Sequence, residues 1–128
     1  MKEPFFLTLA EIIEIHHNQI KLYGGSNGIR DIGLLQSAIA QPQATFSGQY
    51  LHDDIYLMAS AYAFHIAKNH PFLDGNKRAA LASALIFLEL NGIFINDPKQ
   101  KLLQAMLNLS QGQLTKDELA ELLRELSS

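Results

Sequence analysis

The sequence predicts an all-α protein, a compact single-domain helical bundle of about six helices around a buried central helix. Apolar residues recur at intervals of three and four along most of the chain, which is the helical period. Two capping boxes, at residues 8–11 and 115–118, mark helix starts near the two ends. Between residues 79 and 88 only Ser83 is polar, so that helix is expected to be buried on every side. No linker or repeat divides residues 1–128, which we treat as one domain.

The first half of the chain predicts two helices and a loop. One helix follows Thr8 and ends at the Gly24-Gly25 pair, because glycine accepts the left-handed conformation found just past a helix end. A second helix begins near Asp31 and stops before Pro42, since the residue before a proline disfavours helix. Residues 42–53 form the longest stretch that we expect to be irregular.

The second half predicts four more helices. The breakers in residues 70–75 predict a loop, and the apolar segment after it predicts the central helix. The four helices are expected from Asp54 to Lys68, from Asn76 to Asn91, from Pro98 to Gly112, and from Thr115 onward.

Composition narrows the functional classes. Ten Lys and Arg residues against thirteen Asp and Glu residues give a net charge of −3, which argues against a nucleic-acid-binding module. The chain has no cysteine, so it has neither a disulfide framework nor a thiolate metal site. The apolar run at residues 5–7 is too short for a signal peptide, and no run is long enough to cross a membrane. We therefore expect a cytoplasmic protein without direct contact to nucleic acid or membrane.

The segment HPFLDGNKR, residues 70–78, gathers chemical groups at the start of the central helix. A helix N-terminus offers free N–H groups and a partial positive charge, which together bind anions. Gly75 lets the backbone approach a ligand closely, and Arg78 can grip a phosphate with two N–H groups. Asp74 is a hard oxygen ligand that suits Mg²⁺ beside phosphate. His70 can take a proton from a hydroxyl near neutral pH. The set predicts phosphoryl-type transfer.

Each of these residues also has a structural interpretation. Asp74 can be a helix N-cap, and His70 can be a loop histidine bonded to the backbone. Lys77 and Arg78 can be solvated charges, although two cations at the positive end of a helix oppose its dipole and favour a bound anion. A hydrolytic metal site at His70 and Asp74 would need a third strong ligand, which the nearby sequence lacks.

The same residues resemble the signature of the Fic/Doc superfamily, whose Fic branch reads H-x-F-x-[DE]-G-N-G-R-x-x-R. Lys77 stands where that signature has its second glycine, and Leu81 stands where it has its final arginine. Both departures match the Doc (death-on-curing) branch, whose motif ends in N-K-R. The segments LYGGSNGIRDIGLLQSAIAQPQATFSGQYLH and ALIFLELNG also resemble Doc-type segments, so the resemblance covers most of the chain.

This resemblance implies a role for each residue of the motif. His70 would be the catalytic base that activates a hydroxyl of the target protein. Asp74 would hold Mg²⁺ on the nucleotide. Gly75, Asn76 and the backbone around Lys77 would line an anion nest, and Arg78 would hold phosphate. The implied cofactors are ATP and Mg²⁺.

The resemblance further implies the toxin of a toxin–antitoxin pair. Doc-type proteins are kinase-type phosphotransferases that modify a threonine of elongation factor Tu and so arrest translation. The residues alone do not choose between attack at the α- and the γ-phosphate, so AMP transfer to a protein hydroxyl stays open, as does a catalytically inactive binding module. Every Glu is followed by Pro, Ile or Leu, so the self-inhibitory motif [ST]-x-x-x-E-[GN] of some Fic proteins is absent. We therefore expect a separate, Phd-like antitoxin as partner.

Four residues outside the motif have two interpretations each. Phe46 and Tyr50 are candidate contacts for a docked target segment, or they fasten a surface loop to the bundle. His16 and His65 fall within predicted helices, and we expect both to be packing histidines rather than catalytic ones.

Overall fold

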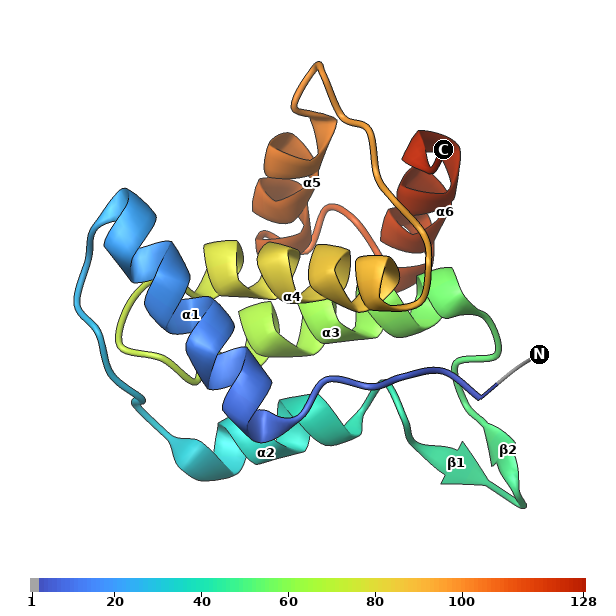
Figure 1. The fold of residues 1–128 in the computed structure, drawn as a ribbon, viewed down its shortest axis with the longest axis horizontal. Coiled ribbons are helices and arrows are strands. Elements are labelled where there is room, and N and C mark those ends of the chain that lie inside the picture. The colour runs from blue at the N-terminus through green and yellow to red at the C-terminus, as the bar shows by residue number, and fades with distance from the viewer. Residues whose placement is uncertain (1–2) are drawn as a thin grey trace.

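A computed structural model describes residues 3–128, and within that range six helices and one short hairpin form a helical bundle (Figure 1). The elements in chain order are α1 (Leu9–Tyr23), α2 (Ile32–Ala40), β1 (Thr45–Phe46), β2 (Gln49–Tyr50), α3 (Ile55–Asn69), α4 (Asn76–Leu90), α5 (Lys101–Ser110) and α6 (Lys116–Leu126). Both predicted capping boxes are present, at Thr8 with Glu11 and at Thr115 with Glu118. The predicted helical fold with about six helices is thus confirmed.

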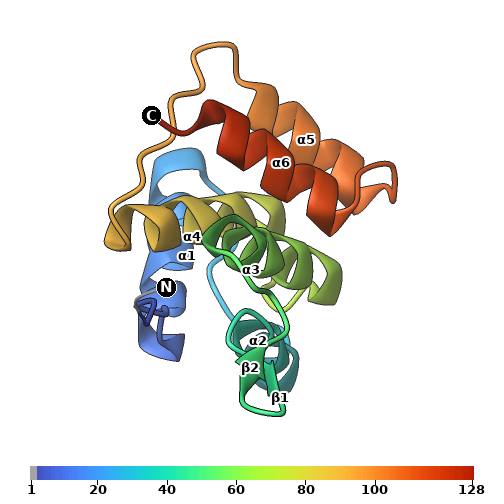
Figure 2. The same ribbon diagram turned by 90° about the vertical axis from the view of Figure 1, so that its right-hand side faces the viewer.

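The helices α3 and α4 lie against each other at the centre of the bundle. Figure 2 shows α5 and α6 side by side on one face of this pair, and α2 with the hairpin on the other. Small residues on α4, such as Ala80 and Ala84, let it pack closely against α3, whose Tyr62 is fully buried. None of the helices within residues 3–128 has the length and apolar character needed to span a membrane.

The prediction that the central helix is buried on every side is wrong along one edge. Ile86 is 38% exposed and Leu90 is 45% exposed, although Ala79 and Phe87 on the same helix are completely buried. The reason lies in the neighbours: α1, α3 and α5 cover α4, and its remaining edge faces solvent. Helix α3 shares the centre, so the core belongs to a helix pair and not to one helix.

The start of α5 differs from the predicted one for a local reason. Helix α5 begins at Lys101 and not at Pro98. The carboxylate of Asp97 accepts hydrogen bonds from the N–H groups of Lys101 (2.9 Å) and Leu102 (2.8 Å), with Gln100 in a left-handed conformation between them. The Asp97 side chain therefore caps the helix from four residues away, and residues 97–100 form the turn that this reach requires.

The stretch predicted to be irregular contains a hairpin. Strand β1 pairs with β2 in antiparallel fashion, with Thr45 opposite Tyr50 and Phe46 opposite Gln49. The Ser47-Gly48 turn has positive φ at both residues, which is the geometry that two-residue hairpins favour. Strands of two residues are too short to show an alternating pattern, which explains why the sequence did not reveal them.

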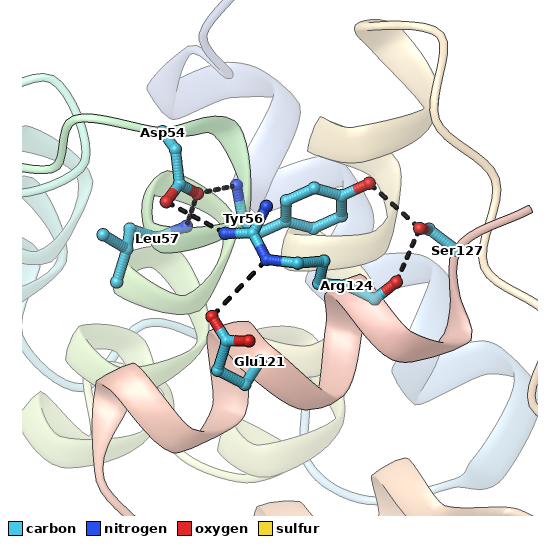
Figure 3. A network of polar contacts seen from close by, with 6 residues as sticks. All are labelled: Asp54, Tyr56, Leu57, Glu121, Arg124 and Ser127. Atoms are coloured by element: carbon cyan, nitrogen blue, oxygen red, sulfur yellow. Dashed lines mark hydrogen bonds and ion pairs between the residues drawn. The ribbon is translucent and has the colours of Figure 1, made fainter.

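The N-terminal end of α3 is closed by a polar network with α6 (Figure 3). Asp54 accepts two backbone N–H groups of the first turn, including that of Tyr56 at 2.8 Å, and binds Arg124 at 3.1 Å. The Arg124 guanidinium lies 4.6 Å from the centre of the Tyr56 ring and 3.4 Å from Glu121. The Tyr56 hydroxyl donates to Ser127 at 3.0 Å. This network fastens α6 to the start of α3.

Candidate active site

A cavity of about 510 Å³ lies where α3 ends and α4 begins. This volume is within the range of about 300–1,000 Å³ that small-ligand sites occupy. The structure brings all six predicted motif residues to its wall, together with three others: Ala67, His70, Leu73, Asp74, Gly75, Asn76, Lys77, Arg78 and Ser110.

His70 ends α3 in a left-handed conformation, with φ 51° and ψ 53°. Its carbonyl accepts a hydrogen bond from Nε of Arg30 at 2.7 Å, and the carbonyl of Asn69 accepts one from the same guanidinium at 3.1 Å. The backbone of His70 is thus held, while its ring is exposed and makes no hydrogen bond to any of residues 3–128. The structural interpretation of a ring bonded to the backbone does not apply, and the ring is free to meet a ligand.

The motif loop is pinned by the segment that joins α1 to α2. The N–H of Leu73 donates to the carbonyl of Gly28 at 3.0 Å, and the carbonyl of Pro71 accepts the N–H groups of Arg30 (2.7 Å) and Asp31 (3.0 Å). Gly28 has φ 144°, and a Cβ there would lie 2.8 Å from the Leu73 side chain. Sequence reasoning missed this pairing, because the two segments are about forty residues apart and neither shows a strand period.

His16 supports the loop from the side of α1. Its Nε2 donates to the carbonyl of Asp74 at 2.7 Å, since a carbonyl can only accept. Its ring stacks on Phe72, with 3.8 Å between ring centres and 3° between planes. Both residues are buried, so the prediction of His16 as a packing histidine is confirmed. What the sequence did not reveal is that His16 packs against the motif itself.

Asn76 has a structural role in its side chain. The residue is buried, its Oδ1 accepts the N–H of Phe72 at 2.9 Å, and its Nδ2 donates to the carbonyl of Phe72 at 3.0 Å. This clamp closes the loop onto the first turn of α4. Only the backbone N–H of Asn76 is therefore left for an anion. Gly75 is the N-cap residue, and no side chain within residues 3–128 caps the helix.

The Asp74 carboxylate is oriented by backbone donors. Its Oδ2 accepts the N–H of Ser26 at 3.3 Å and its Oδ1 accepts the N–H of Gly75 at 2.9 Å. Gly25 has φ 111°, which disfavours other residues, and a Cβ there would also lie 2.6 Å from Oδ2 of Asp74. Asp74 is exposed at the cavity wall and does not cap the first turn of α4, so its alternative interpretation as an ordinary N-cap is not confirmed.

The two cations of the motif differ in their surroundings. Arg78 points toward the end of α1, where one terminal nitrogen lies 3.4 Å from the carbonyl of Gly24 and the guanidinium lies 5.2 Å from the centre of the Tyr23 ring. Lys77 is exposed. The first turn of α4 holds no acidic residue, so these cations and the helix dipole add to one positive site.

The donor set of the cavity fits a magnesium–nucleotide complex. No group of three or more His, Asp or Glu side chains that could hold a metal occurs in residues 3–128. A single carboxylate such as Asp74 matches Mg²⁺, which keeps several waters and binds mainly through substrate phosphates. The uncapped N-terminus of α4, entered through Gly75, offers the N–H groups that a phosphate needs.

Phe46 and Tyr50 lie away from this cavity. Figure 1 draws the hairpin at the opposite end of α3 from the motif loop, and neither residue contributes to the cavity wall. Tyr50 packs 5.7 Å from Phe6 and its hydroxyl donates to Glu3, which agrees with a fastening role. Phe46 is 73% exposed. Docking of a target at these two residues stays a prediction.

The chain is similar to known proteins over most of its length. The sequence profile described as "Fic/DOC family" matches residues 6–88. A protein named "Protein kinase doc" from Escherichia phage P1 is 33% identical over 120 residues, which cover 94% of each chain. A protein named "Toxin Doc" from Mycolicibacterium smegmatis is 44% identical over 71 residues, which are 56% of this chain and 55% of that protein.

Proposed function

Since the chain belongs to the Fic/DOC family, we propose that it is the toxin of a toxin–antitoxin pair and acts as a kinase-type phosphotransferase. The names of the two relatives support the toxin and the kinase parts of this proposal. The observation that carries it is the exposed ring of His70 beside the uncapped, positively polarised start of α4. The target we propose is a threonine hydroxyl of elongation factor Tu, whose modification arrests translation.

The proposed reaction uses three groups of the motif in separate roles. Backbone N–H groups at the start of α4, with Lys77 and Arg78, bind the phosphates of ATP. Asp74 holds Mg²⁺, which neutralises phosphate charge when bound. His70 accepts the proton of the target hydroxyl. The hydroxyl oxygen then forms a bond to the γ-phosphorus while the bond from that phosphorus to the bridging oxygen breaks, and ADP leaves.

Lys77 and Leu81 favour γ-phosphate transfer over AMP transfer. A lysine at the position of the second glycine narrows the nest and adds charge, and a leucine at 81 removes a residue that would grip phosphate. Both features match the branch to which the two named relatives belong. We therefore rank kinase chemistry above AMP transfer and above a purely binding role.

A labelling experiment separates these possibilities. The protein is incubated with Mg²⁺, elongation factor Tu and ATP labelled in either the α- or the γ-phosphate. Transfer of the γ-label alone supports the kinase, and transfer of the α-label indicates AMP transfer. His70→Asn should lower the rate of transfer by about 10²–10⁴-fold. His17→Asn makes the same change at an exposed histidine outside the cavity and should leave the rate unchanged. Growth arrest by a folded but inactive His70→Asn variant would instead support the binding module.

We also propose a site for the Phd-like antitoxin. An apolar groove of about 500 Å³ runs between α1, α4 and α5 and reaches Arg78; it is lined by Gln19, Tyr23, Arg78, Leu81, Ala82, Leu85, Gln100 and Leu103. Leu103 is 57% exposed, so it offers apolar surface to an amphipathic segment that folds on binding. Leu103→Glu should keep toxicity and escape neutralisation when cells co-express the cognate antitoxin. Unchanged neutralisation would remove this groove as the antitoxin site.

A further inference from the structure

A second cavity, of about 550 Å³, adjoins the first. The two cavities share Ala67 and Ser110, so they adjoin along the last turns of α3 and α5, and we call the pair the trough. The second cavity is lined by Phe64, Ala67, Lys68, Leu109, Ser110, Gly112, Leu114, Thr115 and Lys116. Nothing in the proposed phosphoryl transfer uses this second part of the trough.

Two ammonium groups of the second cavity share one aromatic ring. Nζ of Lys68 lies 5.3 Å from the centre of the Phe64 ring, and Nζ of Lys116 lies 5.4 Å from it. Each of these contacts is an ordinary cation–π interaction, and both lysines belong to the cavity wall. Two positive charges on one wall favour an anion inside the cavity.

Lys116 is held in place by two histidines. Its Nζ lies 3.0 Å from Nε2 of His52 and 3.2 Å from Nε2 of His65. Because an ammonium only donates, both rings must accept at Nε2 and carry their proton on Nδ1. Burial and the nearby Lys116 ammonium lower the pKa of His65 to about 4, and the same two causes lower the pKa of His52. Both rings are thus neutral near pH 7 and orient the lysine without adding charge.

The wall of the second cavity carries these two cations and no carboxylate within the part of the chain that the structure describes. Asp117 follows Lys116 along the chain but is exposed and does not line the cavity. Apolar side chains complete the wall, chiefly Phe64 and Leu109. A site with fixed cations and apolar sides suits a carboxylate that is carried on a polypeptide.

We propose that the second cavity binds an acidic side chain of the target protein, so that the enzyme prefers a hydroxyl with an Asp or Glu nearby in sequence. The inference rests on the proposed function, because it assumes that the target hydroxyl lies next to His70. The two cavities share wall residues, so an extended target segment with its hydroxyl at His70 reaches the second cavity within a few residues. The preferred carboxylate therefore lies a few residues from the modified hydroxyl.

A polypeptide fits this part of the trough better than the nucleotide does. The phosphates of ATP are accounted for by the start of α4 in the first cavity, and the second cavity lies along the last turns of α3, which precede His70. Its two lysines offer donors that a carboxylate accepts, while a purine ring would leave both ammonium charges unpaired.

Short threonine peptides test the inference; each carries one Asp, Glu or Lys, placed at a different position beside the threonine. Transfer from γ-labelled ATP is measured for each peptide, and binding of fluorescent versions is measured separately by anisotropy at low and high salt. We expect the acidic peptides to be preferred about fivefold at one position, with a preference that weakens as salt rises. Lys68→Glu should reverse the preference toward the lysine peptides, and Lys116→Met should remove it.

Lys101→Glu is the matched control, because Lys101 is an exposed lysine of α5 outside both cavities. An unchanged preference in that variant together with a reversed one in Lys68→Glu supports the inference. Transfer with no charge preference in the wild type overturns the inference and leaves the proposed kinase intact. Selective binding of acidic peptides without any transfer overturns the kinase and retains the acidic-side-chain site. If the peptides show neither a binding preference nor any transfer, both the inference and the proposed kinase are overturned.

Discussion

The two ends of α3 carry polar clusters that are built in opposite ways. At the N-terminal end, charged side chains bind one another: Asp54 caps the helix, holds Arg124 and brings its guanidinium over Tyr56 (Figure 3). At the C-terminal end, backbone groups take up the hydrogen bonds, because Arg30 binds the main-chain carbonyl of His70 and leaves its ring exposed. At the N-terminal end the polar side chains are paired with one another and stabilise the fold. At the C-terminal end the ring of His70 stays available to a ligand.

The backbone conformation of His70 costs free energy, which the hydrogen bonds from Arg30 offset in part. A non-glycine residue in the left-handed conformation, as at His70, costs about 1–2 kcal/mol. Each hydrogen bond from Arg30 to a loop carbonyl offsets about 1 kcal/mol of that cost. The strain therefore persists where the surrounding loop fixes it, and it sets the position of the ring that we propose as the base.

The largest expected effect comes from removing that ring. His70→Asn should lower the rate of γ-phosphate transfer to elongation factor Tu by about 10²–10⁴-fold, which is the usual contribution of a general base. Asparagine accepts the left-handed conformation, so the melting temperature should stay close to that of the wild type. Initial rates with labelled ATP and scanning calorimetry measure the two quantities. A variant that keeps its rate would remove His70 from the chemistry.

A matched pair of substitutions compares the two ends directly. Arg30→Ala removes two hydrogen bonds from the motif loop, and Asp54→Ala removes the cap of α3 with its ion pair. Both should lower the free energy of unfolding by about 1–2 kcal/mol. Only Arg30→Ala should also lower the transfer rate, by about tenfold, because it frees the backbone that positions His70.

Urea unfolding gives the stability of both variants, and kcat and KM for labelled transfer give their activity. The expected pattern is a fall in kcat for Arg30→Ala and none for Asp54→Ala at equal loss of stability. Equal activity in both variants would mean that the two ends of α3 do not differ in function.

The same comparison explains how much could be predicted from the sequence. The helices could be predicted from capping boxes and from the helical spacing of apolar residues. The motif residues could be predicted because they lie close together in sequence at the start of one helix. The supports of the motif did not follow, because Arg30 and His16 act through contacts more than thirty residues away along the chain. The start of α5 was predicted too early, because the Asp97 carboxylate caps the helix across a turn at residues 97–100. The hydrophobic periodicity of the sequence does not indicate that turn.

Some residues had two interpretations that only packing could separate. Asn76 was expected to line the anion nest, and the structure adds that both polar atoms of its side chain bind the Phe72 backbone. The ring of Tyr50 packs on Phe6, which agrees with a fastening role, while docking of a target there stays a prediction. Residue type limits what a side chain can do, while its neighbours decide which of those possibilities is used.

The free energy of unfolding should depend on pH through His65, which lies on α3 between its two ends. The pKa of His65 is lowered from its ordinary 6.5 to about 4 by burial and by Lys116. Between these values the unfolded chain binds more protons than the folded one, so stability is full above about pH 6.5 and falls as the pH drops toward 4. Because His65 is only partly buried, we expect a loss of about 1 kcal/mol. Urea unfolding at several pH values measures it.

The variant His65→Gln keeps an uncharged acceptor for Lys116 and cannot titrate, so the loss of stability between pH 6.5 and 4 should shrink. Lys116→Met removes one of the causes that lower the pKa of His65, so the loss of stability should shrink to a smaller degree. A full loss in both variants would assign the effect to another group.

The smallest expected effect concerns Glu121, the most exposed acidic residue of the network at the N-terminal end of α3. Glu121 contacts Arg124 at 3.4 Å, but its side chain is 67% exposed, and an exposed pair of this kind contributes about 0–0.5 kcal/mol. Glu121→Gln should therefore change the free energy of unfolding by less than about 0.5 kcal/mol, well below the effect of Asp54→Ala, because Asp54 also caps the helix through backbone N–H groups. Urea unfolding of the two variants, singly and combined, gives the coupling between them. A loss for Glu121→Gln as large as that for Asp54→Ala would mean that charge pairing, and not capping, closes this end of α3.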